Sequence, residues 1–230
     1  MDMTYSAPLS DQQVTMIDIE TTGLDVTSFH VHDVGWCTMS LDDPGERIND
    51  PQTRRFGNGE SMEATGNPTA CITGLTTEDL RGKVPLDKDP DAQSELLHVL
   101  TSRPFMAHNA RYEDEAFKAN VRGYAEAKRA GQVQIMDSMV IARRYDVGSG
   151  RHRNTLEAYA KRWGVIAEDQ GERHLGFEDA VVMGMAVGRN LRTRFAERGG
   201  TPLVEFHSTY DTGRSSGVSY DVHGAEVPAA

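Results

Sequence analysis

The apolar, β-branched run from Val14 to Ile19 restricts the fold of this 230-residue chain more than any other feature of its sequence. Such a run, followed by Thr-Thr-Gly at residues 21–23, predicts a strand buried in a sheet and then a turn. Near its end the strand carries two acids, Asp18 and Glu20. Because side chains alternate along a strand, both carboxylates share one face, while the isoleucines beside Asp18 point into the core. Two carboxylates held together repel each other, and a cation that prefers oxygen ligands, Mg²⁺ or Mn²⁺, would relieve that repulsion.

The order of the predicted elements indicates the fold class. Strands are expected at residues 14–19, 31–39, 53–56, 104–107 and 133–136. Helices are expected at residues 76–81, 92–100, 111–129, 137–145, 154–163 and 176–197. This order predicts an α/β fold with a mixed central β-sheet flanked by α-helices. Residues 13–198 would form that domain, between a loose leader at 1–12 and a flexible Gly- and Ser-rich tail at 199–230.

Composition and charge exclude several classes of protein. The chain has 24 Lys and Arg against 35 Asp and Glu, for a net charge of −11. That balance argues against a basic coat for nucleic acid and against a polybasic membrane binder. No stretch approaches the roughly 18 consecutive apolar residues of a membrane-spanning helix, and the N-terminus has no secretory-signal pattern. The two cysteines, Cys37 and Cys71, cannot form a disulfide framework, so we expect a cytoplasmic protein without membrane contact.

Charge is also distributed unevenly along the chain. Residues 1–50 hold one basic residue against ten acids, whereas residues 118–163 hold ten basic residues against four acids. One interpretation of the basic stretch, above all of the loop Arg151-His152-Arg153, is a wall that guides a phosphate backbone toward an acidic pocket. The other interpretation is a set of solvated helix faces, where Lys and Arg are common.

A second polar cluster follows the strand predicted at residues 104–107. His108 and Asn109 stand at its end, and Glu113 and Asp114 lie in the first turn of the next predicted helix. Acids at that position are also favoured by the helix dipole alone. The cluster is therefore a candidate site only in combination with the acids of the first strand.

A third cluster lies at the start of the last predicted helix. His174 precedes Asp179 by five residues, a spacing that can set both groups beside one water molecule. Histidine is suited to accept a proton near neutral pH. Together, carboxylates from three separate segments can hold two Mg²⁺ ions about 4 Å apart, the arrangement used for in-line displacement at phosphorus. Phosphodiester hydrolysis with His174 as the general base is the chemistry that this combination predicts.

Three motifs in series resemble those of the DnaQ-like (DEDDh) 3′–5′ exonucleases, a family of the RNase H-like superfamily. The segment Asp18–Leu24, with the sequence DIETTGL, resembles the first motif of the family. His108–Ala110, followed by Tyr112 and an acid, resembles the second, and His174 with Asp179 resembles the third. The similarity implies an RNase H-like fold, a two-metal mechanism and the 3′ end of a nucleic acid as substrate.

The resemblance, which covers roughly residues 13–195, also implies roles for individual residues. The metal ligands for two Mg²⁺ or Mn²⁺ ions would be Asp18, Glu20, Glu113 and Asp179, and the general base would be His174. The substrate-binding residues would be Thr21, Thr22, Gly23, Leu24, His108 and Asn109. In this assignment Leu24 wedges against the terminal base, and the backbone near Thr21 meets the 3′-hydroxyl.

The second motif departs from the family pattern. The family usually has Asp where this chain has Glu113, while Asp114 stands one position later. Consecutive helical residues point about 100° apart, so Glu113 and Asp114 cannot both serve as the ligand. Glu113 is favoured because it occupies the usual spacing, and Tyr112 before it is expected in the core.

These features predict a 3′–5′ exonuclease that releases 5′-mononucleotides from single-stranded DNA, in proofreading or end-trimming. The chain shows no polymerase domain, so a proofreading role would require a separate polymerase subunit as partner. One alternative keeps the chemistry and takes RNA, as an exoribonuclease or oligoribonuclease, because the sequence does not show a pocket for the 2′-hydroxyl. Another is a non-catalytic adaptor that docks on a polymerase and needs no metal.

Overall fold

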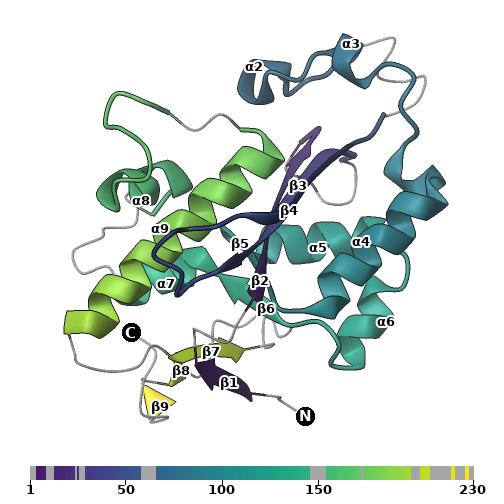
Figure 1. The fold of residues 1–230 in the computed structure, drawn as a ribbon. Helices are drawn as coiled ribbons and strands as arrows, with labels where there is room; N and C mark the ends of the chain where they lie inside the picture. The colour runs from purple at the N-terminus through teal and green to yellow at the C-terminus, as the bar shows by residue number, and fades with distance from the viewer. Residues whose placement is uncertain are drawn as a thin grey trace.

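The computed structural model describes residues 4–8, 13–23, 25, 29–57, 66–145, 154–171, 174–197, 203–207, 219–220 and 226–227. Its centre is a five-stranded mixed sheet with the strand order β4-β3-β2-β5-β6 (Figure 1). The strands are β2 (Gln13–Thr21), β3 (Val31–Ser40), β4 (Asn49–Arg55), β5 (Phe105–Ala107) and β6 (Ile135–Asp137). The pairs β2-β3 and β3-β4 are antiparallel, and β2-β5 and β5-β6 are parallel. The predicted mixed α/β class is therefore confirmed.

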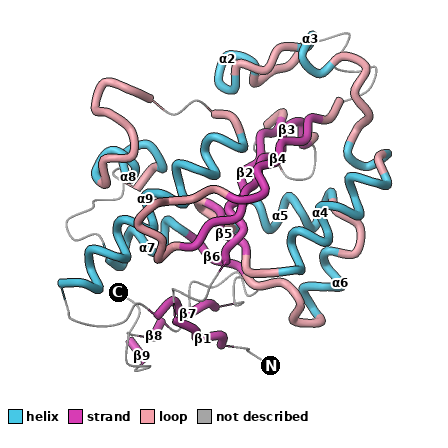
Figure 2. Tube along the Cα trace, viewed as in Figure 1, coloured by secondary structure: helices cyan, strands magenta, loops and turns pink. Residues whose placement is uncertain are grey.

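Helices cover both faces of this sheet (Figure 2). One face carries α4 (Pro90–Ser102), α5 (Arg111–Asn120) and α6 (Tyr124–Arg129). The other carries α7 (Ser138–Tyr145), α8 (Leu156–Arg162) and α9 (Gly176–Glu197). Three short elements connect β4 to α4: α2 (Ala70–Thr73), α3 (Thr77–Leu80) and the 3₁₀ helix η2 (Leu86–Lys88). In Figure 1, α2 and α3 lie at the end of the sheet where β2 finishes.

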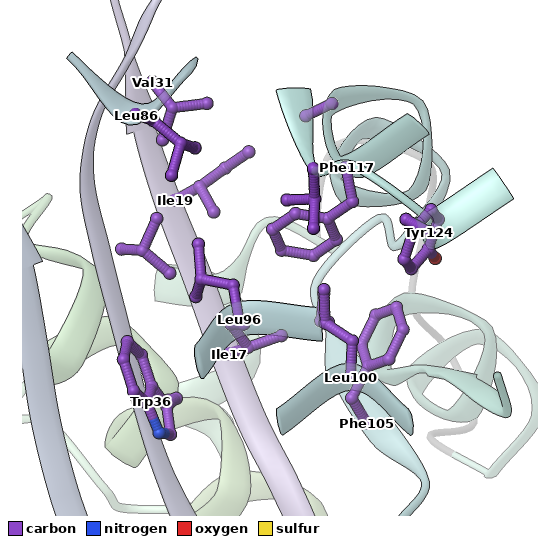
Figure 3. Packing of buried hydrophobic residues seen from close by; sticks show 14 of the residues in the cluster. Ile17, Ile19, Val31, Trp36, Leu86, Leu96, Leu100, Phe105, Phe117 and Tyr124 are labelled. Atoms are coloured by element: carbon purple, nitrogen blue, oxygen red, sulfur yellow. The ribbon is translucent and has the colours of Figure 1, made fainter. Parts of the chain in front are cut away.

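The alternation of β2 divides the interior into two cores. Ile17 and Ile19 pack on the α4–α6 side with Phe105 and Phe117, as Figure 3 shows. Met16 packs on the opposite side, among residues of α8 and α9. Burial of apolar side chains on both faces fixes the register of β2, because a slip of one residue would exchange its two faces. That register decides which side of the sheet receives Asp18 and Glu20.

The helix expected at residues 111–129 is two helices in the structure. The first, α5, ends at Asn120, and α6 begins at Tyr124. Gly123 between them has a φ of 82°, a left-handed conformation that glycine adopts without steric cost. Because the apolar pattern continues through the break, helical spacing alone did not show it.

Strand β4 is longer than the predicted strand at residues 53–56 and begins before Pro51. Trp36 pairs with Gln52 and Thr38 with Asn49, so Asp50 and Pro51 together oppose a single residue of β3. This bulge lies on the edge strand of the sheet, where a proline without an N–H group is tolerated.

A separate two-stranded antiparallel sheet joins β1 (Thr4–Pro8) to β7 (Leu203–His207). These strands fall in the segments for which a loose leader and a flexible tail were expected. A short pair, β8 (Ser219–Tyr220) with β9 (Glu226–Val227), follows. Among the described residues, no helix has the length and apolar character needed to cross a membrane.

His32 on β3 is a buried titratable residue that makes the stability of the fold depend on pH. Its side chain is fully buried, and neither ring nitrogen has a hydrogen-bond partner within the described part of the chain. Burial lowers the pKa of His32 from 6.5 to about 4, because a charged imidazole cannot be solvated there.

Stability should therefore fall as the pH is lowered from about 6.5 toward 4. In that range the unfolded chain binds a proton at His32 and the folded chain does not, which costs about 2 kcal/mol of unfolding free energy between pH 7 and pH 5. Urea unfolding of the wild type and of His32→Leu at both pH values measures this cost. We expect the variant to lose less stability than the wild type; parallel losses would show that His32 does not titrate in this way.

Candidate metal centre

The acids of β2 lie on the face of the sheet that α9 covers. Asp18 and Glu20 continue the row of Met16, whose side chain packs in the core on that side. Both carboxylates are partly exposed, whereas the preceding residues of the row are buried. The pairing between β2 and β3 shifts between Glu20 and Thr21, so the strand is irregular directly after the second acid. This placement is the one that the alternation of the sequence predicts.

Two glycines seat the start of α9 directly on the sheet. A Cβ atom on Gly35 of β3 would lie 1.8 Å from the backbone N of Phe177, and one on Gly176 would lie 2.7 Å from the backbone N of Gly35. Gly35 is the partner of Asp18 in the register of β2 and β3. The first turn of α9 therefore rests on the strand pair beside Asp18, where any side chain at position 35 would push it away.

Asp33 fixes the same helix end from β3. Its Oδ2 accepts a hydrogen bond of 3.1 Å from the backbone N–H of Gly176, and the side chain is buried. Burial raises the pKa of the Asp33 carboxyl, while Arg55 and the Gly176 amide partly offset the rise. Sequence analysis did not single out Asp33 or Gly35, because their role depends on a contact between segments about 140 residues apart.

Replacing Gly35 with alanine should destabilise the protein. The added methyl group would enter the backbone of α9, so we expect a loss of about 2–4 kcal/mol, at or above the usual cost of overpacking a core. Gly171→Ala is the matched control, because a Cβ there would meet only Glu157 Oε2 at 3.8 Å. Urea unfolding measures both variants. Equal stabilities for the two would contradict the close contact between α9 and β3.

Three side chains from two parts of the chain meet at this helix end. Among the described residues, Glu20, His174 and Asp179 form a group whose candidate ligand atoms all lie within 4.8 Å of one another. His174 has a φ of 49°, and the backbone N–H of Asp179 donates to Leu175 O at 3.0 Å in the first turn of α9. The predicted ligands Asp18 and Glu113 lie outside this group of three.

The geometry of α5 distinguishes between Glu113 and Asp114. Asp114 is buried on the side of α6, where its carboxylate accepts from Tyr124 Oη at 2.8 Å and from Lys128 Nζ at 2.7 Å. Lys118 Nζ lies 3.0 Å from the same carboxylate. Asp114 thus holds α5 against α6, and its carboxylate is engaged by Tyr124 and Lys128.

Glu113 is buried, and its Oε2 has no hydrogen-bond partner among the described residues. Burial raises the pKa of the Glu113 carboxyl well above its ordinary value, and the charges of Asp137 and Glu20 add to the rise. A buried carboxylate oxygen without a partner is costly unless a cation or proton compensates it. Glu113 therefore has the chemistry of a metal ligand.

Tyr112 precedes Glu113 on α5. Burial raises the pKa of its phenol, and the negative charges of Glu113, Glu20 and Asp18 add to the rise. Tyr112 packs beside the first core, as expected, but it is only partly buried, and its hydroxyl group contacts Thr21 and Gly23.

His108 holds the loop before α5 in place. Both ring nitrogens of His108 are engaged inside the protein: Nδ1 with Ser138 Oγ at 2.8 Å and Nε2 with the carbonyl of Asn154 at 2.7 Å. Burial lowers the pKa of His108. Its side chain therefore supports the loop, and its contact with substrate stays a prediction.

Asp137 at the end of β6 was not predicted as a site residue. Its carboxylate accepts from the backbone N–H groups of Asn109 at 3.1 Å, Ala110 at 3.2 Å and Met139 at 2.8 Å. Asn109 has a φ of 65°, and Asp137 stabilises this left-handed turn. An aspartate between a strand and a helix is a common helix cap, and that signal was visible in the sequence.

The loop after β2 contains most of the predicted substrate-binding residues. Thr22 exchanges two hydrogen bonds with the backbone of His30, at 2.9 and 3.0 Å. Thr21 and Gly23 interact with Tyr112, as described below. Leu24, the predicted wedge, lies outside the described residues.

Much of the basic stretch is neutralised within the protein. Lys118 and Lys128 pair with Asp114, Arg129 pairs with Glu126 at 2.9 Å, and Lys161 pairs with Glu157 at 2.7 Å. These pairs favour the interpretation of solvated and ion-paired helix faces for this part of the stretch. The Arg151-His152-Arg153 loop lies outside the described residues.

The donor set fits a hard divalent cation. Carboxylate oxygens of Glu20 on β2 and Asp179 on α9 meet beside His174, and Glu113 on α5 has a buried oxygen without a hydrogen-bond partner among the described residues. Oxygen-rich sites of this kind suit Mg²⁺ or Mn²⁺. The imidazole of His174 adds a group that can accept a proton in the same place.

Compared with known proteins, the chain matches no family model and no curated protein.

Proposed function

We propose that the chain is a metal-dependent 3′–5′ exonuclease of the DnaQ-like (DEDDh) type with an RNase H-like fold. The observation that carries the proposal is the approach of the candidate ligand atoms of Glu20, His174 and Asp179 to within 4.8 Å of one another. The buried Glu113, whose Oε2 has no hydrogen-bond partner among the described residues, supports it. The strand order supports the fold assignment, because three antiparallel strands are followed by two parallel ones on the same sheet.

Asp18, Glu20, Glu113 and Asp179 would hold two Mg²⁺ or Mn²⁺ ions, which activate a water molecule and neutralise charge on the leaving oxygen. Proton transfer in this reaction falls to a side chain of the protein. An imidazole nitrogen of His174 accepts the proton of the attacking water as its oxygen bonds to phosphorus. The bond from phosphorus to the 3′-oxygen of the preceding nucleotide breaks. The leaving 3′-oxygen takes a proton from solvent, so the products are a 5′-mononucleotide and a shortened strand with a 3′-hydroxyl group.

The loop at residues 21–23 would contact the terminal nucleotide, because it directly follows the second acid of β2. A short single-stranded 3′ end suits a chain with a net charge of −11 better than a long duplex does, since few phosphates need to be bound. DNA is the proposed substrate, in proofreading beside a separate polymerase subunit or in end-trimming.

A gel assay tests this function. Single-stranded DNA and RNA of one sequence, labelled at the 5′ end, are incubated with Mg²⁺, Mn²⁺ or EDTA. We expect a ladder that shortens from the 3′ end, only with metal, and faster on DNA. A faster ladder on RNA would assign the chain to the exoribonucleases. Absence of cleavage with every metal, from a folded sample, would favour a non-catalytic adaptor.

A further inference from the structure

Three hydroxyl groups connect the loop after β2 to two other segments. Tyr112 Oη on α5 lies 2.6 Å from Thr21 Oγ1 and 2.9 Å from the carbonyl oxygen of Gly23. Thr21 Oγ1 lies 2.6 Å from the same Gly23 carbonyl. On the other side, Thr69 Oγ1 donates to the carbonyl of Thr21 at 2.9 Å. The loop is thus held from α5 and from the segment before α2.

The hydrogen atoms of this cluster can be placed in two ways. If Tyr112 donates to Gly23 O, Thr21 donates to Tyr112 Oη; if Thr21 donates to Gly23 O, Tyr112 donates to Thr21 Oγ1. In both arrangements the Gly23 carbonyl is satisfied and the two hydroxyl groups are bonded to each other. Removing the hydroxyl group of Tyr112 would break the link between α5 and the loop in either case.

We propose that Tyr112 is a positioning residue, whose hydroxyl group holds the Thr21–Gly23 loop in the shape that receives the terminal nucleotide. This inference rests on the proposed function. Tyr112 stands next to Glu113, so one turn of helix carries both a candidate metal ligand and the tether of the loop. Nucleotide binding and the metal centre would then be kept in register by a rigid element.

Packing of the ring does not account for the hydroxyl group. The ring of Tyr112 lies against Phe29, with centroids 5.7 Å apart, and next to the first core. Phenylalanine would make the same apolar contacts. The phenol oxygen, by contrast, forms hydrogen bonds with Thr21 and Gly23 of the loop. The ring and the hydroxyl group can therefore be tested separately.

Tyr112→Phe should raise KM for a single-stranded 3′ end about three- to tenfold, the range given by the loss of one or two hydrogen bonds, with kcat changed less than twofold. Thr21→Val should raise KM similarly, and the double variant should be little worse than either single one. Tyr159→Phe is the matched control, because it removes a hydroxyl group bonded to Asn190 Nδ2 at 2.7 Å, in the second core. Its KM should equal that of the wild type.

Hydrogen exchange of the peptide that spans residues 18–30 completes the test and needs no activity. We expect faster exchange in Tyr112→Phe than in the wild type and in Tyr159→Phe. Unchanged exchange would overturn the tether, and faster exchange with an unchanged KM would overturn its role in substrate binding. A wild type that cleaves nothing would overturn the proposed function and the substrate role together, while the exchange rates would still decide whether the tether exists.

Discussion

Glu20→Gln should lower the rate of metal-dependent hydrolysis roughly 10³-fold or more, since metal ions supply several kcal/mol of charge stabilisation at such sites. Glutamine keeps the size of the side chain and removes the negative charge that Glu20 contributes to the group with His174 and Asp179. The fold should persist, because the substitution removes one charge from a cluster of carboxylates that repel each other. Gel assays at saturating Mn²⁺ and urea unfolding measure the two properties.

Glu95→Gln provides the matched control for this variant. Glu95 lies on α4, on the opposite face of the sheet, and pairs with Arg54 at 2.8 Å. Because that pair is partly exposed, its loss should change stability by less than about 1 kcal/mol and leave hydrolysis unchanged. Wild-type rates for Glu20→Gln, or equal losses in both variants, would exclude Glu20 from the reaction.

His174→Asn should slow turnover by roughly 10²–10⁴-fold, the usual contribution of a general base. Asparagine is chosen because His174 has a φ of 49°, and asparagine tolerates the left-handed region better than most residues do. Gel assays with Mn²⁺ compare the rate of this variant with that of the wild type.

His98→Gln on α4 controls for the loss of a histidine elsewhere in the protein. It should keep the rate of the wild type. An unchanged rate in His174→Asn would show that His174 does not act as the base.

Local sequence patterns predicted the main strands and helices because burial and periodicity are local properties of the chain. The run at residues 14–19 formed the central strand β2, and the pattern at residues 176–197 formed α9 with the same bounds. What local patterns could not show was the break at Gly123, whose left-handed conformation interrupts a continuous apolar stripe. The bulge at Pro51 was hidden for a similar reason, since it depends on pairing with β3.

In the candidate site, too, some features follow from local sequence and others depend on contacts between distant segments. Spacing within single segments singled out Glu20, His174 and Asp179, which the fold brings together. The contact of Gly35 with the start of α9 joins distant segments, so neither residue type nor spacing indicates it. The ion pairs of Asp114 with Lys118 and Lys128, which commit its carboxylate to packing, were likewise not visible in the sequence.

Tyr112 illustrates how a correct location can conceal a role. The sequence predicted a core residue, and the ring does pack on the core. Its hydroxyl group, however, reaches the loop through atoms of Thr21 and Gly23, about 90 positions earlier in the chain. Only the assembled fold brings these groups together.

The most direct test of a metal-dependent exonuclease is the first product released from single-stranded DNA labelled at its last internucleotide phosphate. We predict that labelled 5′-mononucleotide appears first with Mg²⁺ or Mn²⁺, and that EDTA and Glu20→Gln each abolish its release. Folded wild-type protein that releases no mononucleotide, or releases it equally in EDTA, would contradict the assignment of this acidic and histidine-containing site to metal-dependent hydrolysis.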